Sequence, residues 1–153
     1  MKFEEAKTLL CESLKHIEKN LYWLSKSYEK VKDIDLTYLD EDNFEIIEVM
    51  LSRFSRTVDL LINRILRTLD IVELEDVTKK LDTVIRAEKR GFVDDYRELI
   101  ELKDLRNELS HEYIADELVE KVKEVIEKTP NLIGIVKKVI EYVDKMNYCK
   151  EEL

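Results

Sequence analysis

A sustained heptad seam near the N-terminus is the feature that most restricts how this chain folds. Apolar side chains recur there at alternating spacings of four and three residues: Leu10, Leu14, Ile17, Leu21, Leu24, Tyr28 and Val31. This spacing is typical of a helix that packs lengthwise against nearly parallel or antiparallel neighbours. We therefore predict a helix from about Phe3 to Val31 that is one member of a helical bundle.

The rest of the chain offers few positions at which a helix must end. The 153 residues contain only two glycines and one proline, and the apolar periodicity predicts helices over about 43–69 and 74–89. A further helix is predicted to start near residue 94 and to carry the stretch 105–113 near its C-terminal end, and two more are predicted from about 116 and from Thr129-Pro130 to about 146. Thr129-Pro130 has the form of an N-cap followed by a first-turn proline, so we expect the chain to restart or kink there. The predicted fold is all-α, a single domain over residues 1–153 built as an up-and-down bundle of five to six helices.

Composition narrows the function classes. A net charge of −9 argues against a general nucleic-acid binder, although it leaves room for a local basic site. No apolar run approaches the roughly 18–20 residues that span a bilayer, and Phe3-Glu4-Glu5 does not begin a signal peptide, so we expect a cytoplasmic protein without a membrane partner. Cys11 and Cys149 match no metal-ligand spacing and are expected to be free thiols. We predict no metal site and no cofactor.

The second predicted helix carries an unusual arginine stripe. At about 100° per residue, its four arginines fall within a sector of roughly 80°: Arg53, Arg56, Arg64 and Arg67. Guanidinium groups pair bidentately with phosphate oxygens, so this stripe is a candidate surface for RNA or for an acidic partner. A solvated face that pairs with acidic neighbours is an equally good interpretation.

The reactive side chains of the chain gather in one stretch, Leu105 to Tyr113. Arg106, Asn107, His111 and Tyr113 lie within it. Histidine suits proton transfer near neutral pH, and arginine suits the charge that builds on a phosphate. Together they suggest phosphodiester cleavage through a neighbouring 2′-hydroxyl, without a metal.

Helix geometry leaves two interpretations of this stretch open. On a regular helix Asn107 and His111 share a face, whereas Arg106 and His111 diverge by about 140°. Arg106 and His111 could converge if the helix loosens near His111, or if a second copy of the chain supplies the other half of the site across a two-fold axis. Such cleavage usually needs two proton-transfer groups; a symmetric dimer would provide two histidines, and the carboxylates of Glu108 and Glu112 are also available. The alternative is structural: His111 caps the helix, and Arg106 pairs with an acid.

The stretch resembles a known family signature. Arg106-Asn107-Glu108-Leu109-Ser110-His111-Glu112-Tyr113 matches the R-N-x-x-x-H-x-Y pattern of HEPN domains, in particular the HepT-like toxins that are encoded beside minimal nucleotidyltransferase (MNT) antitoxins. Ser52-Arg53-Phe54-Ser55-Arg56 followed by Asp59 also resembles the R-F-x-x-x-x-D helix of these proteins, as does Lys89-Arg90-Gly91-Phe92 before the motif helix. The resemblance covers roughly residues 42–140.

The resemblance implies a HEPN-like bundle that forms a homodimer and cleaves RNA without a metal. It implies that Arg106 and His111 are catalytic, with Asn107 in support. It also implies that the partner nucleotidyltransferase neutralises the toxin by adenylylating Tyr113. Some relatives are described as non-catalytic, substrate-binding partners of the nucleotidyltransferase, and this remains the alternative function.

Overall fold

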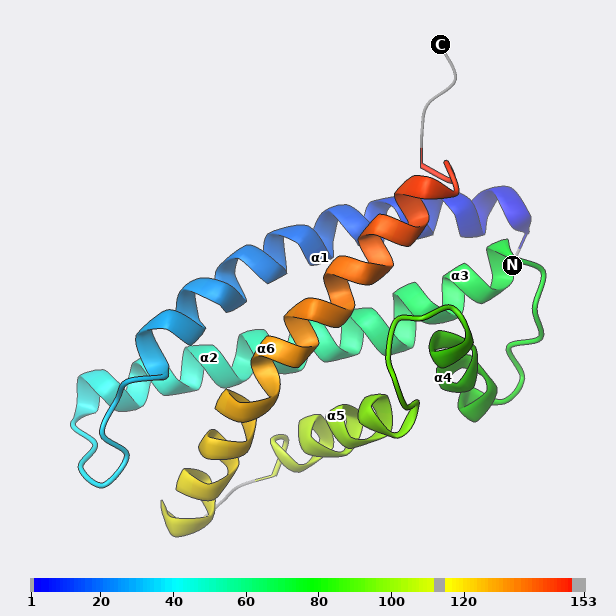
Figure 1. The fold of residues 1–153 in the computed structure, drawn as a ribbon. Helices are drawn as coiled ribbons and strands as arrows, with labels where there is room; N and C mark the ends of the chain where they lie inside the picture. Colours follow the sequence, from blue (N-terminus) through cyan, green and yellow to red (C-terminus); the bar gives the residue numbers. More distant parts are fainter. Residues whose placement is uncertain (1, 112–114, 150–153) are drawn as a thin grey trace.

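The computed structural model describes residues 2–111 and 115–149. Its elements are α1 (Phe3–Val31), α2 (Glu41–Asp59), the π-helix η1 (Leu60–Leu66), α3 (Arg67–Val72), α4 (Lys80–Lys89), α5 (Arg97–Glu108) and α6 (Ala115–Lys145). Because α2, η1 and α3 follow one another without a break, they form one long rod, and the described chain consists of five helical rods (Figure 1). No strand occurs in the described residues, so the prediction of an all-α bundle is confirmed.

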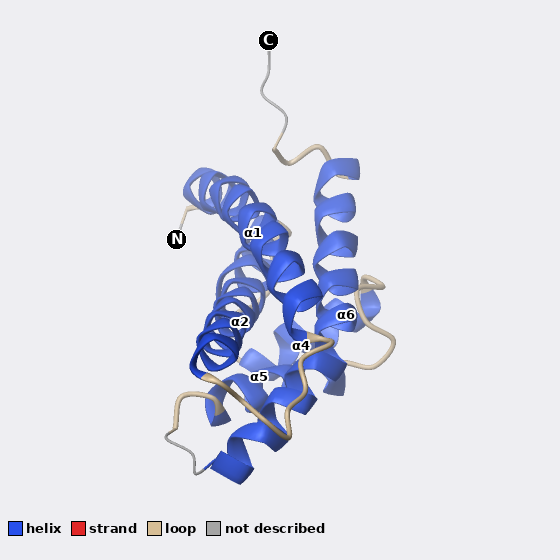
Figure 2. Cartoon of the chain, turned by 90° about the vertical axis from the view of Figure 1, so that its left-hand side faces the viewer, coloured by secondary structure: helices blue, strands red, loops and turns tan. Residues whose placement is uncertain are grey.

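The two longest segments set the frame. Helix α1 lies antiparallel along α2, η1 and α3, and α6 packs against α1 and α2 (Figure 1). Viewed from the side, α1 and α2 stand next to each other, α6 flanks them, and α4 and α5 lie below (Figure 2). The core therefore lies between α1, the α2–α3 rod and α6, while α4 and α5 close its lower side.

The predicted heptad seam is confirmed. Helix α1 has the predicted bounds. Six of the seven seam side chains are buried, and Tyr28 is half-buried against the core. At α2, the side chain of Asp40 accepts a hydrogen bond from the Asn43 amide and so caps the N-terminus of the helix.

Helix α4 begins at Lys80, so the prediction of a helix from about residue 74 is wrong. Leu74 instead ends α3 with a φ of 63°. The amide of Leu74 donates to the Ile71 carbonyl and the amide of Glu75 donates to the Asp70 carbonyl, which is the Schellman pattern. Glycine usually occupies this left-handed position, so the leucine gave no signal of a helix end.

Helix α6 is one continuous helix through Pro130, so of the restart or kink predicted at Thr129-Pro130 the restart does not occur. The Thr129 hydroxyl does not act as an N-cap: it donates 2.6 Å back to the Val125 carbonyl. Proline removes one hydrogen bond from the helix interior. The buried side chains of Val125, Leu132 and Ile135 on either side anchor the helix to the core across this position.

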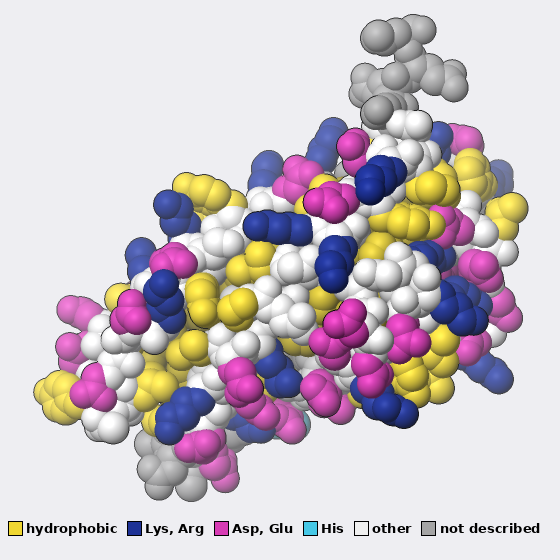
Figure 3. Space-filling view, in the orientation of Figure 1, with side chains coloured by type: hydrophobic (Ala, Val, Ile, Leu, Met, Phe, Trp, Pro, Cys, Tyr) yellow, Lys and Arg dark blue, Asp and Glu magenta, His cyan; other side chains and the backbone are white. Residues whose placement is uncertain are grey.

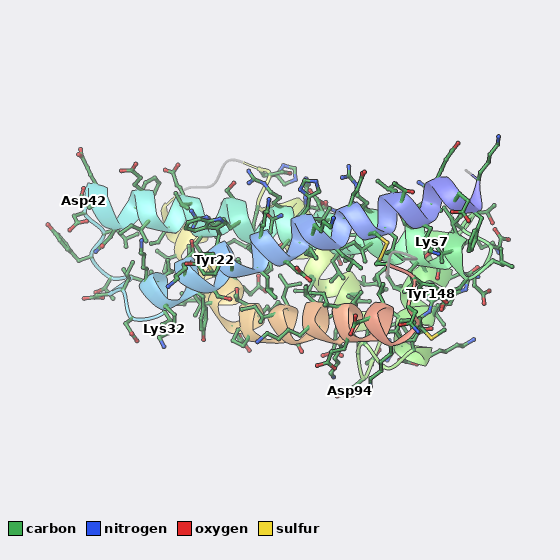
Figure 4. The ribbon with its side chains drawn as sticks, turned by 90° about the horizontal axis from the view of Figure 1, so that it is seen from above. Lys7, Tyr22, Lys32, Asp42, Asp94 and Tyr148 are labelled. Atoms are coloured by element: carbon green, nitrogen blue, oxygen red, sulfur yellow. A yellow bond between two sulfur atoms is a disulfide. The ribbon has the colours of Figure 1, made fainter. Side chains whose placement is uncertain are left out.

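Cys11 and Cys149 form a disulfide, contrary to the prediction of free thiols. Their Cα atoms lie 5.4 Å apart and 138 residues apart in sequence. Figure 4 shows the bond between α1 and the turn that follows α6. The spacing of two cysteines could not reveal this pairing, because it depends on α6 returning along α1. By the chain-entropy model, a cross-link that closes such a long loop lowers the entropy of the unfolded chain and so stabilises the fold by on the order of 5 kcal/mol.

A partly buried network of charges and phenols joins α3, α4 and α6 below that disulfide. Asp70 is fully buried and accepts hydrogen bonds from Arg90 at 2.7 Å and from Arg86 at 3.1 Å. Glu73 accepts from Arg90 Nε at 2.8 Å and from the hydroxyls of Tyr142 and Tyr148 at 2.7 and 2.6 Å. The network satisfies the charges that this end of the bundle buries, as buried charges require.

The network shifts the pKa values of its members in opposite directions. Burial alone would raise the pKa of Glu73, but hydrogen bonds from Tyr148 and Tyr142 and the charge of Arg90 hold it below its usual value. Burial and the bond to Glu73 raise the pKa of the Tyr148 and Tyr142 phenols. By linkage, the Glu73 contribution is present above its unfolded pKa and is lost as pH falls through the folded value. The phenol contribution is present below pH of about 10 and is lost above it.

We predict that Tyr148→Phe lowers the free energy of unfolding at pH 7 by about 1–3 kcal/mol, because Glu73 loses one charge-assisted hydrogen bond. The difference from wild type should shrink below pH of about 4 and again above pH of about 10. Urea denaturation across this pH range, with the disulfide intact, measures it. Tyr38→Phe, at a phenol that is 75% exposed, is the control and should change little. A Tyr148→Phe deficit that stays constant with pH would contradict the assignment.

The surface of the α6 side mixes acidic and basic side chains (Figure 3). None of the helices in residues 2–111 and 115–149 is long and apolar enough to cross a membrane.

Candidate functional site

Arg106 is anchored where α5 meets the end of α2. The apolar face of α5 buries Leu99, Leu102 and Leu105. The next residue, Arg106, extends its guanidinium to α2, where Nη2 donates 2.7 Å to Asp59 Oδ2. The Nε of Arg106 is buried and has no hydrogen-bond partner among the described residues. The ion pair that the structural interpretation expects is therefore present, but it leaves part of the guanidinium fork unused.

Beside this ion pair lies a groove of about 750 Å³ between α1, the α2–η1 segment and α5. Its lining consists of His16, Asn20, Arg56, Asp59, Leu60, Asn63, Arg64, Lys103, Arg106 and Asn107. Four of these side chains are cations and one is a carboxylate, on a chain whose net charge is −9. Because Asp59 is already paired with Arg106, the groove is locally basic and suits an anion.

The structure divides the arginine stripe. Arg56 and Arg64 line this groove with Arg106. Arg67 lines a neighbouring groove of about 630 Å³ between η1, α4 and α5, which shares Asn63, Lys103 and Asn107 with the first. On a regular α-helix the four arginines would share one sector. The wider turns of η1 lie between Arg56 and Arg67 and change the direction of the later arginines.

Arg53 turns to α1 instead. Its Nη1 donates to the Ser27 hydroxyl at 2.7 Å and to the Trp23 carbonyl at 3.1 Å. Its guanidinium carbon lies 5.2 Å from the centre of the Trp23 ring, within cation–π range. These contacts give Arg53 a structural place between two helices.

His111 lies beyond the helix that carries Arg106. Helix α5 ends at Glu108, and the following amides of Ser110 and His111 donate to carbonyls only three residues back. Asn107 and His111 therefore do not lie one turn apart on a regular helix, contrary to the prediction that they share a helix face. His111 is exposed and is not among the residues that line either groove beside Arg106. Tyr113, the predicted modification site, lies outside the described residues.

The sequence did not point to the groove residues contributed by α1. His16 has no partner that the sequence indicates; it is exposed, as a surface histidine is, and it also lines the same groove as Arg106. Asn20, one turn further along α1, and Asn63 and Lys103 also line it. The available signal was the antiparallel pairing of the first two predicted helices, which places His16 and Asn20 near Leu60 and Arg56.

The groove contains the groups needed to hold a phosphodiester. Guanidinium forks can bind the non-bridging oxygens, Asn20, Asn63 and Asn107 can hydrogen-bond to sugar or base edges, and an imidazole can move a proton. Within the part of the chain that the structure describes, no group of three or more His, Cys, Asp or Glu side chains could hold a metal ion.

No protein-family model matches the chain, and no curated protein or solved structure matches it either.

Proposed function

We propose that this protein is a metal-independent endoribonuclease, the toxin of a HEPN/MNT toxin–antitoxin pair. The observation that carries the proposal is the position of Arg106 and Asn107 in a groove that also presents Arg56, Arg64 and Lys103. A phosphodiester is the anion that matches several guanidinium groups along one channel. The resemblance of residues 106–113 to the R-N-x-x-x-H-x-Y signature supplies the reaction class.

The same resemblance supplies the partners. A homodimer would place two copies of the Arg106–His111 stretch at one cleft, and a minimal nucleotidyltransferase would neutralise the toxin in the cytoplasm. RNA is favoured over DNA as the substrate because the 2′-hydroxyl provides an internal nucleophile, which needs neither a metal nor an activated water. Arg106 would bind the phosphate and stabilise the charge that develops on it.

We predict that the purified protein cleaves single-stranded RNA in EDTA and that Arg106→Ala slows cleavage by about 10²–10³-fold, since one donor to the developing charge is lost. His111→Ala should also slow it. Gel analysis of a labelled oligoribonucleotide measures both effects. Arg97→Ala is the matched control, because Arg97 lies on the same helix, is 71% exposed and pairs with Asp95 outside the groove.

Cleavage at the wild-type rate by both Arg106→Ala and His111→Ala would contradict the proposal. Absence of cleavage by the wild type, together with a stable complex with the neighbouring gene's nucleotidyltransferase, would instead support the non-catalytic alternative. The net charge of −9 is the observation that favours this alternative.

Regulation by the partner is tested at Tyr113. The phenolic oxygen would attack the α-phosphorus of ATP, release pyrophosphate and lose its proton, leaving AMP on the tyrosine. The added charge two residues from His111 would repel an RNA phosphate. Incubation with the nucleotidyltransferase and ATP should therefore add AMP mass to the wild type and abolish cleavage. A mass increase that persists in Tyr113→Phe would show that another residue is modified.

A further inference from the structure

We propose that His16, on α1, is a proton-transfer group of the RNA-cleaving site and acts beside Arg106 within the same chain. This inference rests on the proposed ribonuclease function and deepens it, because it assigns a role to a helix outside the residues that resemble the HEPN signature. The cleavage needs a base and an acid, but the stretch around Arg106 contains only one histidine, so a second proton-transfer group is required.

Helix packing places His16 at the groove. The seam residues Leu14, Ile17 and Leu21 are buried against the core, so His16 and Asn20 flank the seam on its solvent side. Trp23, a further three residues along, is half-exposed on the same side of α1 and holds the guanidinium of Arg53.

The antiparallel register of α1 and α2 then determines which residues lie near His16, Asn20 and Trp23. Trp23 contacts Arg53, and each step back along α1 is matched by a step forward along α2. Asn20 therefore lies at the groove with Arg56, and His16 lies there with Asp59 and Leu60. Since Arg106 pairs with Asp59, the imidazole of His16 and the guanidinium of Arg106 border one groove from opposite helices.

His111 does not occupy this position in the described chain. It lies three residues past the end of α5, is exposed, and is absent from the lining of the groove that contains Arg106. The histidine that one chain presents beside Arg106 is His16. The four groove cations would bind the phosphate at the scissile bond, and this imidazole would take the proton of the 2′-hydroxyl or give a proton to the departing 5′-oxygen.

The reaction is a balanced transesterification. The 2′-oxygen attacks phosphorus and passes its proton to a base, while the bond from phosphorus to the 5′-oxygen breaks and that oxygen takes a proton from an acid. The products are a 2′,3′-cyclic phosphate and a 5′-hydroxyl, and no oxidant, water or metal is consumed. His16 performs one of these two transfers.

The test separates proton transfer from RNA binding. His16→Ala should slow cleavage by about 10²–10⁴-fold. It should change the affinity for a 2′-O-methyl oligoribonucleotide, which cannot react, by less than about threefold, because no phosphate contact from Lys or Arg is lost. Added imidazole should restore part of the cleavage rate in His16→Gly. Asn20→Ala, at the same groove without an ionisable group, is the matched control and should show no rescue by imidazole.

Each result decides a different claim. Cleavage by His16→Ala at the wild-type rate overturns the role of His16 while the proposed ribonuclease function stands. A loss of cleavage that is matched by an equal loss of affinity, without imidazole rescue, also overturns it, because His16 would then only bind RNA. If the wild type cleaves no RNA in EDTA, the proposed function fails and this inference fails with it.

Discussion

The packing of α1 along the α2–α3 rod is the constraint on which the rest of the molecule depends. Buried apolar side chains of both helices meet along the whole length of α1. This contact fixes the antiparallel register, and the register decides which polar residues lie together at the rim of the contact. Arg53 contacts Trp23 and Ser27, and Arg56 lines the same groove as Asn20 and His16. A slip of one helical turn would separate these groups.

The ion pair between Arg106 and Asp59 does not block ligand binding. The two side chains are 32% and 37% exposed, and an ion pair in such a position contributes only about 0–1 kcal/mol to stability. A phosphate can therefore approach the exposed part of the guanidinium and add to this pairing or displace it. Asp59 holds Arg106 at the groove, while Arg56, Arg64 and Lys103 keep the local potential positive on an acidic chain. The basic site is thus confined to this groove, on a chain whose net charge is negative.

Helices marked by a sustained apolar repeat could be predicted from the sequence. Features that depend on local backbone hydrogen bonds, or on contacts between segments distant in sequence, could not. The heptad seam of α1 gave its bounds and its buried face. No residue pattern marks the π-helix η1. The predicted directions of Arg64 and Arg67 relative to Arg53 therefore assumed α-helical turns where the chain has wider π-helical ones. Leu74 takes a conformation usual for glycine, so this apolar residue was assigned to the start of the next helix, whereas it terminates α3.

The candidate site shows the same division. Arg106 and Asn107 could be singled out from residue chemistry, and the structure places them at a groove. No glycine or proline marks the end of α5 at Glu108, so the predicted helix carried His111, whereas the structure places His111 past the end of α5. His16 and the disulfide partner Cys149 could be placed only once the three-dimensional pairing of α1 with α2 and with the end of α6 was known.

The central claim is that the groove between α1, α2–η1 and α5 binds the RNA backbone. Arginine side-chain NMR of the wild-type protein, titrated with an uncleavable 2′-O-methyl oligoribonucleotide, tests this most directly. We predict that the Nε–Hε signals of Arg56, Arg64 and Arg106 shift together and saturate at one concentration, while Arg97 does not respond. Saturable shifts confined to arginines outside the groove, or no shift at any arginine, would contradict the claim.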